Sequence, residues 1–156
     1  FYNPSSPISY FIGNEAIEQY IAEGMKGRFM KSIKRVLSNA SFIDTRIHNQ
    51  KYTAADLVTL ILKDLKTKAD EIVGFECEKV IMGRPVFFDD NNTLKDQLAQ
   101  KRLLQAAEQT GFTEVRFQFE PIGAAFLYER SITQKEKVLV AKAKGTCIVP
   151  KESQRY

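Results

Sequence analysis

Residues 114–128 read EVRFQFEPIGAAFLY, and this stretch decides the fold class of the protein. Apolar side chains alternate in its first half, which predicts a strand over 114–119. Pro121 stands at a favoured first helical position, which predicts a helix over 121–130. A strand that leads directly into a helix is typical of α/β proteins.

The same alternation of elements extends back along the chain. The spacing of apolar residues and the positions of Gly, Pro and Asn predict further helices, a small hairpin and two more strands. The predicted helices are 15–22, 28–37, 53–72 and 93–109, the hairpin joins 41–47 to 51–53, and the strands are 77–82 and 137–141. We therefore expect an α/β layer architecture.

Two of these helices have the clearest sequence signals. Thr53 and Asp56 have the spacing of a capping box, and Gly74 can end the helix that they begin. Gly111 can end the second helix in the same way. Apolar residues at helical spacing predict the buried faces: Leu57, Leu60, Ile61, Leu65, Ala69 and Ile72 in the first helix, and Leu94, Leu98, Leu103, Leu104 and Ala107 in the second.

The composition of the 156-residue chain is that of a soluble globular protein, with 44% hydrophobic and 27% charged residues. No apolar stretch approaches the roughly 18–20 residues that span a bilayer, so we expect no membrane partner. With two cysteines and one histidine, the sequence argues against a zinc site, a thiol protease and a Ser-His-Asp hydrolase. We interpret Cys77 and Cys147 as reduced core residues of a cytosolic protein, and His48 as a turn residue.

Glu120 is the first candidate for a functional residue. In open α/β sheets, ligands bind outside the carboxyl ends of the strands, and Glu120 stands at such an end. Its carboxylate could hold a water molecule or a water-coordinated metal ion. An acid just before helical N–H groups is also a common helix cap, and the spacing alone favours that structural interpretation.

A basic stretch is the second candidate. No acidic residue occurs between Glu23 and Asp44, whereas Lys26, Arg28, Lys31, Lys34 and Arg35 all fall there. Such a run could bind the phosphate of a nucleotide or of a nucleic acid, and it could equally be a solvated helix face. A net charge of +4 without interleaved exposed aromatic residues gives little support for nucleic-acid binding.

Gly145 and Thr146 form the third candidate, because they lie in a short connection between two apolar segments. Backbone amides in such a loop can bind phosphate. The loop matches neither a Walker motif nor a dinucleotide fingerprint, and by itself it is typical of a hairpin turn.

Taken together, these segments resemble a known family. Residues 120–128, Glu-Pro-Ile-Gly-Ala-Ala-Phe-Leu-Tyr, are similar to the Glu-Pro-x-Ala-Ala-Ala-x-x-Tyr signature of the actin-like ATPase domains of the heat shock protein 70 (DnaK-type) family. The strand 77–82, the loop with Pro85 and the helix 93–109 follow in the order of that family. Gly-Arg-Pro-Val-Phe-Phe at 83–88 and the pattern at 27–34 resemble, more narrowly, its YegD-like chaperone branch.

The resemblance extends from about Phe11 to Ala141 and implies a ribonuclease-H-like ATPase fold in two lobes, with ATP and Mg²⁺ bound between them. Glu120 matches the family glutamate that positions the magnesium-bound water and the attacking water. Lys34 matches the lysine that reaches the γ-phosphate. Gly145 and Thr146 stand where the family has a second phosphate loop. An acid and a lysine suit phosphoryl transfer, which depends mostly on positioning and charge neutralisation.

The chain also departs from the family pattern. The opening Asp-x-Gly-Thr loop is absent, and Lys142-Ala143-Lys144 replaces the start of the second glycine-rich loop. Together with Phe1 in place of an initiator Met, this predicts a fragment, mostly the first lobe, of a cytoplasmic bacterial chaperone. We expect the intact protein to bind ATP, ADP and client proteins, and the chain alone to hydrolyse ATP negligibly. Two alternatives remain: a noncatalytic interaction module, and a nucleic-acid-binding domain that uses a basic helix at 26–35.

Overall fold

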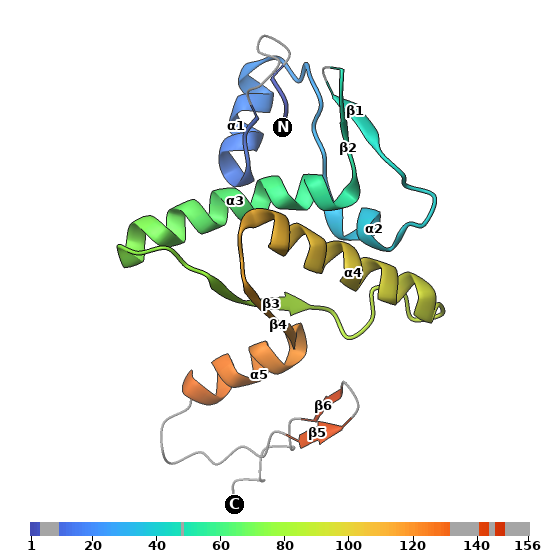
Figure 1. Cartoon of the computed structure of the whole chain (residues 1–156), viewed down its shortest axis with the longest axis vertical. Helices are drawn as coiled ribbons and strands as arrows, with labels where there is room; N and C mark the ends of the chain where they lie inside the picture. Colours follow the sequence, from blue (N-terminus) through green and yellow to red (C-terminus); the bar gives the residue numbers. More distant parts are fainter. Residues whose placement is uncertain (4–9, 48, 132–140, 144–145, 149–156) are drawn as a thin grey trace, which may run out of the picture. The chain divides into compact units, whose positions relative to one another are not determined.

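The fold is described from a computed structural model of the chain (Figure 1). The structure describes residues 1–3, 10–47, 49–131, 141–143 and 146–148. The chain divides into two compact units: the first unit comprises residues 1–79 and 88–114, and the second unit comprises residues 80–87 and 115–156.

Helices and strands alternate through the described residues. The helices are α1 (Gly13–Ala22), α2 (Ile33–Ser38), α3 (Ala54–Val73), α4 (Thr93–Thr110) and α5 (Glu120–Ser131). The strands are β1 (Thr45–Ile47), β2 (Gln50–Tyr52), β3 (Lys79–Arg84), β4 (Glu114–Phe119), β5 (Ala141–Ala143) and β6 (Thr146–Ile148). The strands form two-stranded sheets, in which β1 pairs with β2, β3 with β4, and β5 with β6. The mixed α/β character predicted from the sequence is therefore confirmed.

The capping box predicted for α3 is present. The Asp56 backbone N–H donates to Oγ1 of Thr53 at 3.2 Å, and the Thr53 backbone N–H donates to Oδ2 of Asp56 at 2.8 Å. Gly74 ends the helix with φ 78°, a left-handed conformation that glycine adopts without steric cost. Residues 53–74 thus fold locally as their sequence predicts.

Helices α3 and α4 pack side by side and form the centre of the first unit (Figure 1). Small residues line their contact, because Ala55 is 2% exposed and Ala99, Ala106 and Ala107 are fully buried. Side chains this small let two helix backbones approach closely. The predicted apolar faces are wrong in part, since Leu65 is 55%, Ile72 85% and Leu94 76% exposed. The partner helix covers only the parts of α3 and α4 that face it.

A second cluster of apolar residues lies at the other side of α3. Tyr2, Ile47 and Leu57 are buried together, and the side chains packed against them are Met30, Ile33, Phe42, Tyr52 and Leu60. The cluster joins the chain start, the β1–β2 hairpin and α3, which are far apart in sequence. In that hairpin Thr45 stands opposite Tyr52 and Ile47 opposite Gln50, in antiparallel register.

The helix predicted over 28–37 is wrong in its first half, because α2 begins only at Ile33. Arg28 pairs its backbone with Tyr2: Tyr2 N–H donates to the Arg28 carbonyl at 3.0 Å, and Arg28 N–H donates back at 3.4 Å. Ser32 has φ 56°, a left-handed conformation that interrupts a right-handed helix. Contacts with the distant chain start therefore take residues 28–32 out of the predicted helix.

The β3–β4 pair differs in part from its prediction. The buried strand expected over 77–82 is β3, Lys79–Arg84, and it is buried on one face only, because Met82 is 9% but Ile81 72% exposed. Cys77 precedes the strand and is half-buried, so its interpretation as a core residue is wrong. β4 has the predicted bounds, and α5 begins at Glu120, one residue before the prediction. His48, residues 137–140 of a predicted strand and the side chain of Cys147 lie outside the described residues.

Candidate functional site

Glu120 lies where β4 ends and α5 begins, as the sequence predicts. Phe119 is the last residue of the strand, and Glu120 is the first residue of the helix and exposed. A carboxylate in the first turn of a helix interacts favourably with the helix dipole. The same position also places the carboxylate at a strand end. It is therefore compatible with a helix-capping role and with a ligand-binding role.

The neighbouring strand leaves room for Glu120. A Cβ atom added to Gly83 in β3 would lie 3.4 Å from Cγ of Glu120, so any larger residue at 83 would touch the acidic side chain. In the sequence, Gly83 is notable as the start of the stretch 83–88 that resembles the YegD-like branch. A pairing of β3 with β4, had it been expected from the sequence, would have placed Gly83 near Glu120.

Arg84 is a buried cation at the same strand end, and its burial could not be foreseen from the sequence. Its side chain is buried, with Nε donating to the Pro85 carbonyl at 3.0 Å and Nη2 to the Val86 carbonyl at 3.2 Å. Its Cζ lies 5.6 Å from the centroid of the Phe119 ring, a cation–π distance. Gly83, Arg84, Phe119 and Glu120 thus form what we call the strand-end cluster. The cluster thus contains one buried guanidinium and one exposed carboxylate.

Lys34 is the second residue of α2, and its side chain is exposed. It belongs to the first unit, whereas the strand-end cluster belongs to the second unit. The surroundings of Glu120 are Gly83, Arg84 and Phe119, whereas Lys34 lies on α2, which packs against α3 and α4.

Arg102 of α4 is a residue that sequence reasoning missed. Nη1 donates to the carbonyls of Val36 at 3.0 Å, Leu37 at 2.9 Å and Asn39 at 2.9 Å, and Nη2 donates to the carbonyl of Phe42 at 2.8 Å. These carbonyls end α2 and begin the segment after it. An arginine within a polar helix stretch carries no sequence signal of such a long-range contact.

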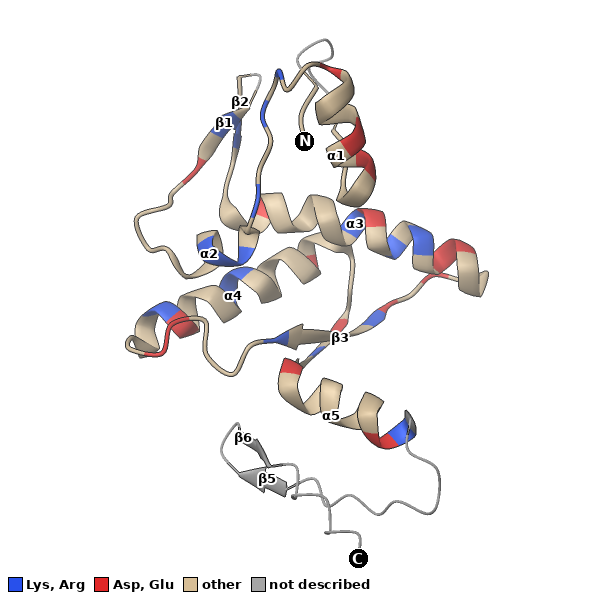
Figure 2. Cartoon of the chain, turned by 180° about the vertical axis from the view of Figure 1, so that it is seen from behind, with Lys and Arg blue, Asp and Glu red and all other residues tan. Residues whose placement is uncertain are grey.

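The basic stretch does not form the helix that the sequence predicts. Lys26, Arg28 and Lys31 precede α2, and Figure 2 shows the basic residues along this non-helical segment. Nη2 of Arg28 donates to Oγ1 of Thr45 at 3.1 Å, and Nζ of Lys31 lies 5.6 Å from the Phe29 ring centroid. A continuous basic helix face at 26–35 is therefore absent from the structure.

Gly145 lies outside the described residues, and Thr146 begins β6. β5 and β6 are antiparallel, with Ala143 opposite Thr146. The interpretation of this segment as a hairpin is confirmed for the two strands. A phosphate-binding role for Gly145 and Thr146 stays a prediction.

A bound Mg²⁺ would find one carboxylate at the strand-end cluster. Within the described part of the chain, no three His, Cys, Asp or Glu side chains gather as a group that could hold a metal ion. Mg²⁺ in phosphate sites commonly keeps several waters and binds one or two carboxylates together with the substrate phosphates. The single exposed Glu120 fits a hydrated ion that also binds phosphate, and does not fit a cage built by the protein alone.

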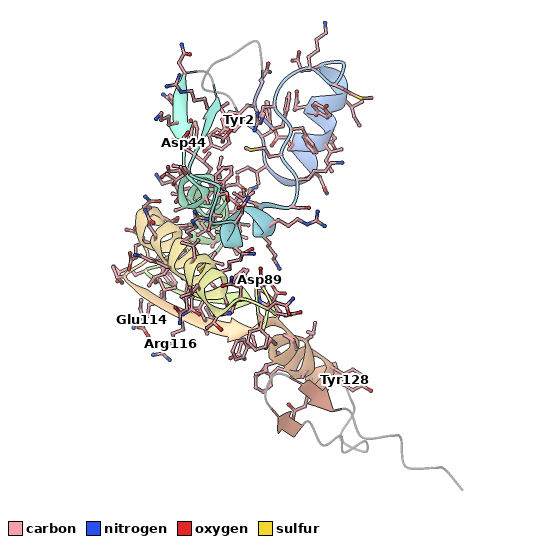
Figure 3. The ribbon with its side chains drawn as sticks, turned by 90° about the vertical axis from the view of Figure 1, so that its right-hand side faces the viewer. Tyr2, Asp44, Asp89, Glu114, Arg116 and Tyr128 are labelled. Carbon is pink, nitrogen blue, oxygen red and sulfur yellow. The ribbon has the colours of Figure 1, made fainter. Side chains whose placement is uncertain are left out.

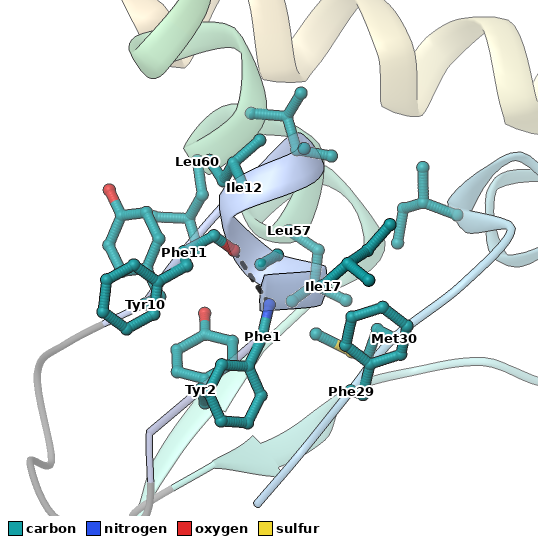
Figure 4. Close-up of a pocket in the computed structure, with 14 residues that line it drawn as sticks. Phe1, Tyr2, Tyr10, Phe11, Ile12, Ile17, Phe29, Met30, Leu57 and Leu60 are labelled. Carbon is teal, nitrogen blue, oxygen red and sulfur yellow. Dashed lines mark hydrogen bonds between the residues drawn. The ribbon is translucent and has the colours of Figure 1, made fainter. Parts of the chain in front are cut away.

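An apolar pocket of about 210 Å³ lies in the first unit (Figure 4). It is lined mostly by aromatic and aliphatic side chains, among them Phe1, Tyr10, Phe29, Met30 and Ile33. The hydroxyl of Tyr2, another lining residue, is buried and has no hydrogen-bond partner in the described residues, and burial raises its pKa. Because no lining side chain is cationic, the pocket does not suit the phosphates of a nucleotide.

No helix among the described residues combines the length and the apolar character needed to cross a membrane.

Comparison with known proteins identifies the family. The family model described as "Hsp70 protein" matches residues 6–145. The chain is 33% identical over 131 residues to chaperone protein DnaK of Thermosipho africanus, covering 83% of this chain and 20% of that protein. It is 33% identical over 115 residues to DnaK of Thermotoga maritima, covering 72% and 18%, and 30% identical over 110 residues to DnaK of Mycoplasmopsis agalactiae, covering 70% and 17%.

The chain thus spans about one fifth of the length of these curated relatives. The family model nevertheless covers most of the 156 residues, including the strand-end cluster and Lys34. The chain belongs to the Hsp70 family, and the actin-like ATPase fold predicted from residues 120–128 is the fold of that family.

Proposed function

We propose that this chain is part of the nucleotide-binding domain, mostly the first lobe, of an Hsp70-type chaperone that binds and hydrolyses ATP. The observation that carries the proposal is the position of Glu120 at the junction of β4 and α5, within the family signature 120–128. Gly83 and Arg84 on the paired strand add space and positive charge at the same place.

Each site residue has a role that its chemistry supports. The Glu120 carboxylate accepts hydrogen bonds from water, which lets it orient an attacking water molecule and a water of a hydrated metal ion. The Lys34 ammonium donates to phosphate oxygens and neutralises their charge. Mg²⁺, when bound, supplies the main neutralisation of the triphosphate. Backbone amides near Gly145 and Thr146 would add further donors to phosphate.

The chaperone part of the proposal is supported by the name of the relatives, chaperone protein DnaK. Client proteins as partners, a cytoplasmic location and membership in the YegD-like branch belong to the same proposal. The family match and the DnaK relatives support the first two, and residues 83–88 support the third.

The test is ATP turnover by the full-length protein with and without Mg²⁺. We expect magnesium-dependent hydrolysis that falls when Glu120 or Lys34 is replaced. Hydrolysis that none of these changes affects would contradict the site. A stable protein partner bound equally with and without nucleotide, in a protein that lacks ATPase activity, would favour a noncatalytic interaction module. Binding of labelled DNA or RNA that weakens steeply with salt would favour a nucleic-acid-binding domain.

The chain alone provides a second test. Because much of the phosphate-binding backbone of the family has no counterpart in this sequence, we expect calorimetry to detect no tight binding of MgATP to the 156-residue chain. Micromolar affinity would contradict that expectation.

A further inference from the structure

We infer that Arg102 is a positioning residue for Lys34: its guanidinium fastens the C-terminal end of α2 to α4 and so sets the place of the lysine. This inference rests on the phosphate-binding role proposed for Lys34. The structure joins the two residues through α2, a short helix with few anchors of its own.

Helix α2 needs tertiary contacts to exist. It spans Ile33–Ser38, six residues, which is far below the length at which an isolated helix is stable in water. Its N-terminal neighbour Ser32 forms no side-chain capping hydrogen bond. One side chain of the helix, Leu37, is buried, at 3% exposure. The helix is therefore held mainly by what contacts its buried face and its C-terminal end.

Arg102 supplies the contact at the C-terminal end. The last carbonyls of a helix have no partner within the helix and carry partial negative charge. Arg102 donates to the carbonyls of Val36 and Leu37 inside α2 and to those of Asn39 and Phe42 beyond it, at 2.8–3.0 Å. One side chain thus closes the helix end and fixes the direction in which the chain leaves it.

An arginine suits this geometry better than a lysine. Nη1 donates to the carbonyls of Val36, Leu37 and Asn39, and Nη2 on the other arm of the planar guanidinium donates to the carbonyl of Phe42. A lysine has the same charge, but its donors lie on one nitrogen at the end of a flexible chain. It can keep the interaction with the helix dipole and part of the contacts of Nη1, but it has no second nitrogen for the Phe42 carbonyl.

Helix α4, which carries Arg102, is well anchored. Helix α4 spans Thr93–Thr110 and is capped by the side chain of Asn92, whose Oδ1 accepts from the Lys95 N–H at 3.1 Å. Its alanine face packs against α3. Lys34 lies three positions before Leu37, about one helical turn from the carbonyls that Arg102 binds. A loosened helix end therefore changes the direction of the Lys34 side chain.

The test is a double-mutant cycle in the full-length protein, with MgATP as substrate. Arg102→Met and Lys34→Ala are made singly and together, and kcat and KM are measured for each variant. We expect Arg102→Met to lower kcat by about 10- to 100-fold, as expected for a misplaced group. We expect it to lower kcat by less than about twofold in the Lys34→Ala protein, because the lysine is then no longer there to be positioned. Arg102→Lys should also lower kcat, because it loses the planar fork and the second nitrogen that donates to the Phe42 carbonyl.

A control and two contrary results complete the test. Lys101→Met changes the exposed neighbour on α4 and should leave kcat unchanged. Equal losses from Arg102→Met in both backgrounds, or full activity in Arg102→Lys, would show a general structural role and overturn the inference while Lys34 keeps its function. If Lys34→Ala has normal kcat, the proposed role of Lys34 fails, and the inference fails with it. Thermal unfolding of each variant identifies a protein that has not folded, and in that case Arg102→Lys replaces Arg102→Met in the cycle.

Discussion

Gly83 and Glu120 are neighbours across the β3–β4 pair, since a Cβ atom at Gly83 would lie 3.4 Å from Cγ of Glu120. The absence of a side chain at 83 thus gives the glutamate its space. Gly83 does not have a positive φ, so a larger residue can take its backbone conformation. An alanine Cβ there would make an ordinary van der Waals contact, so crowding of Glu120 begins with a larger side chain.

Gly83→Val should lower ATP turnover of the full-length protein by about 10- to 100-fold, because branched methyl groups would displace the Glu120 side chain. Steady-state kinetics measures the loss. The matched control is Gly123→Ala in α5, where an added Cβ would meet no atom within 4 Å. That variant should keep its activity and gain about 0.5–1 kcal/mol of stability from helix propensity. Equal activity in both variants would contradict the crowding argument.

Glu120→Gln should lower kcat by about 10²-fold or more, because an amide cannot accept the proton of an attacking water. The side-chain volume hardly changes, so circular dichroism and the melting temperature should stay those of the parent protein. Glu129→Gln near the other end of α5 removes the same charge from an exposed position and should leave kcat unchanged. A normal kcat in Glu120→Gln would remove this residue from the site.

Lys34→Ala should lower kcat by about 10²-fold through the loss of one phosphate donor. The exposed side chain makes a large change in stability unexpected. Lys26→Ala is the matched control, because Lys26 is exposed, lies in the same basic stretch and precedes α2. If both substitutions lower turnover alike and the loss shrinks as the ionic strength rises, the stretch acts through its general charge and not through one lysine.

Thr53→Ala should destabilise the chain by about 1 kcal/mol, because it removes the hydroxyl that accepts from the Asp56 N–H. Urea unfolding followed by the helix signal in circular dichroism measures the difference. Thr67→Ala replaces an exposed threonine within α3 and should be neutral or slightly stabilising, since alanine has the higher helix propensity. Equal loss in both variants would show that the cap contributes nothing.

Asp70→Asn should lower the stability of the folded state at neutral pH and have little effect on it in acid. Nζ of Lys66 donates to Oδ2 of Asp70 at 2.8 Å, the Cys77 N–H donates to Oδ1 at 2.7 Å, and these bonds lower the pKa of the carboxyl group. A lowered pKa in the folded state stabilises the fold above the unfolded value of about 3.9, and this contribution is lost as the pH falls through the folded value. Unfolding midpoints at pH 7 and pH 3 check the sign, with the exposed Asp90→Asn as control. An equal loss of stability from Asp70→Asn at both pH values would contradict this link between the pKa of Asp70 and stability.

Two ion pairs at the ends of helices and strands show which contacts can be expected from sequence spacing alone. Nζ of Lys95 lies 3.1 Å from Oδ2 of Asp89 just before α4, and Nζ of Lys79 lies 3.0 Å from Oε2 of Glu114, where β4 begins. Figure 3 labels the acidic member of each pair, Asp89 and Glu114. The first pair is close in sequence and could have been expected from spacing. The second joins residues of two paired strands, and only the pairing reveals it.

Sequence periodicity predicted α3, α4 and β4 well because the signals that mark them lie within a few residues. The capping box, the glycine stops and the alternation of apolar residues are all local. The same reasoning failed at 28–32, where Arg28 pairs with Tyr2, and at Leu94 and Ile72, where an apolar helix face extends past its partner. These outcomes depend on residues far away in the chain.

By itself, the sequence determined the family, the order of most elements and the identity of the candidate site residues Glu120 and Lys34. Motif residues are contiguous, and helix and strand signals are short-range, so they can be read without a structure. Only the tertiary structure decided the surroundings of these residues: the burial of Arg84, the space that Gly83 leaves and the reach of Arg102 to the end of α2. The physical reason is that a side-chain hydrogen bond or a close packing contact joins residues brought together by folding, and their sequence separation carries no trace of it.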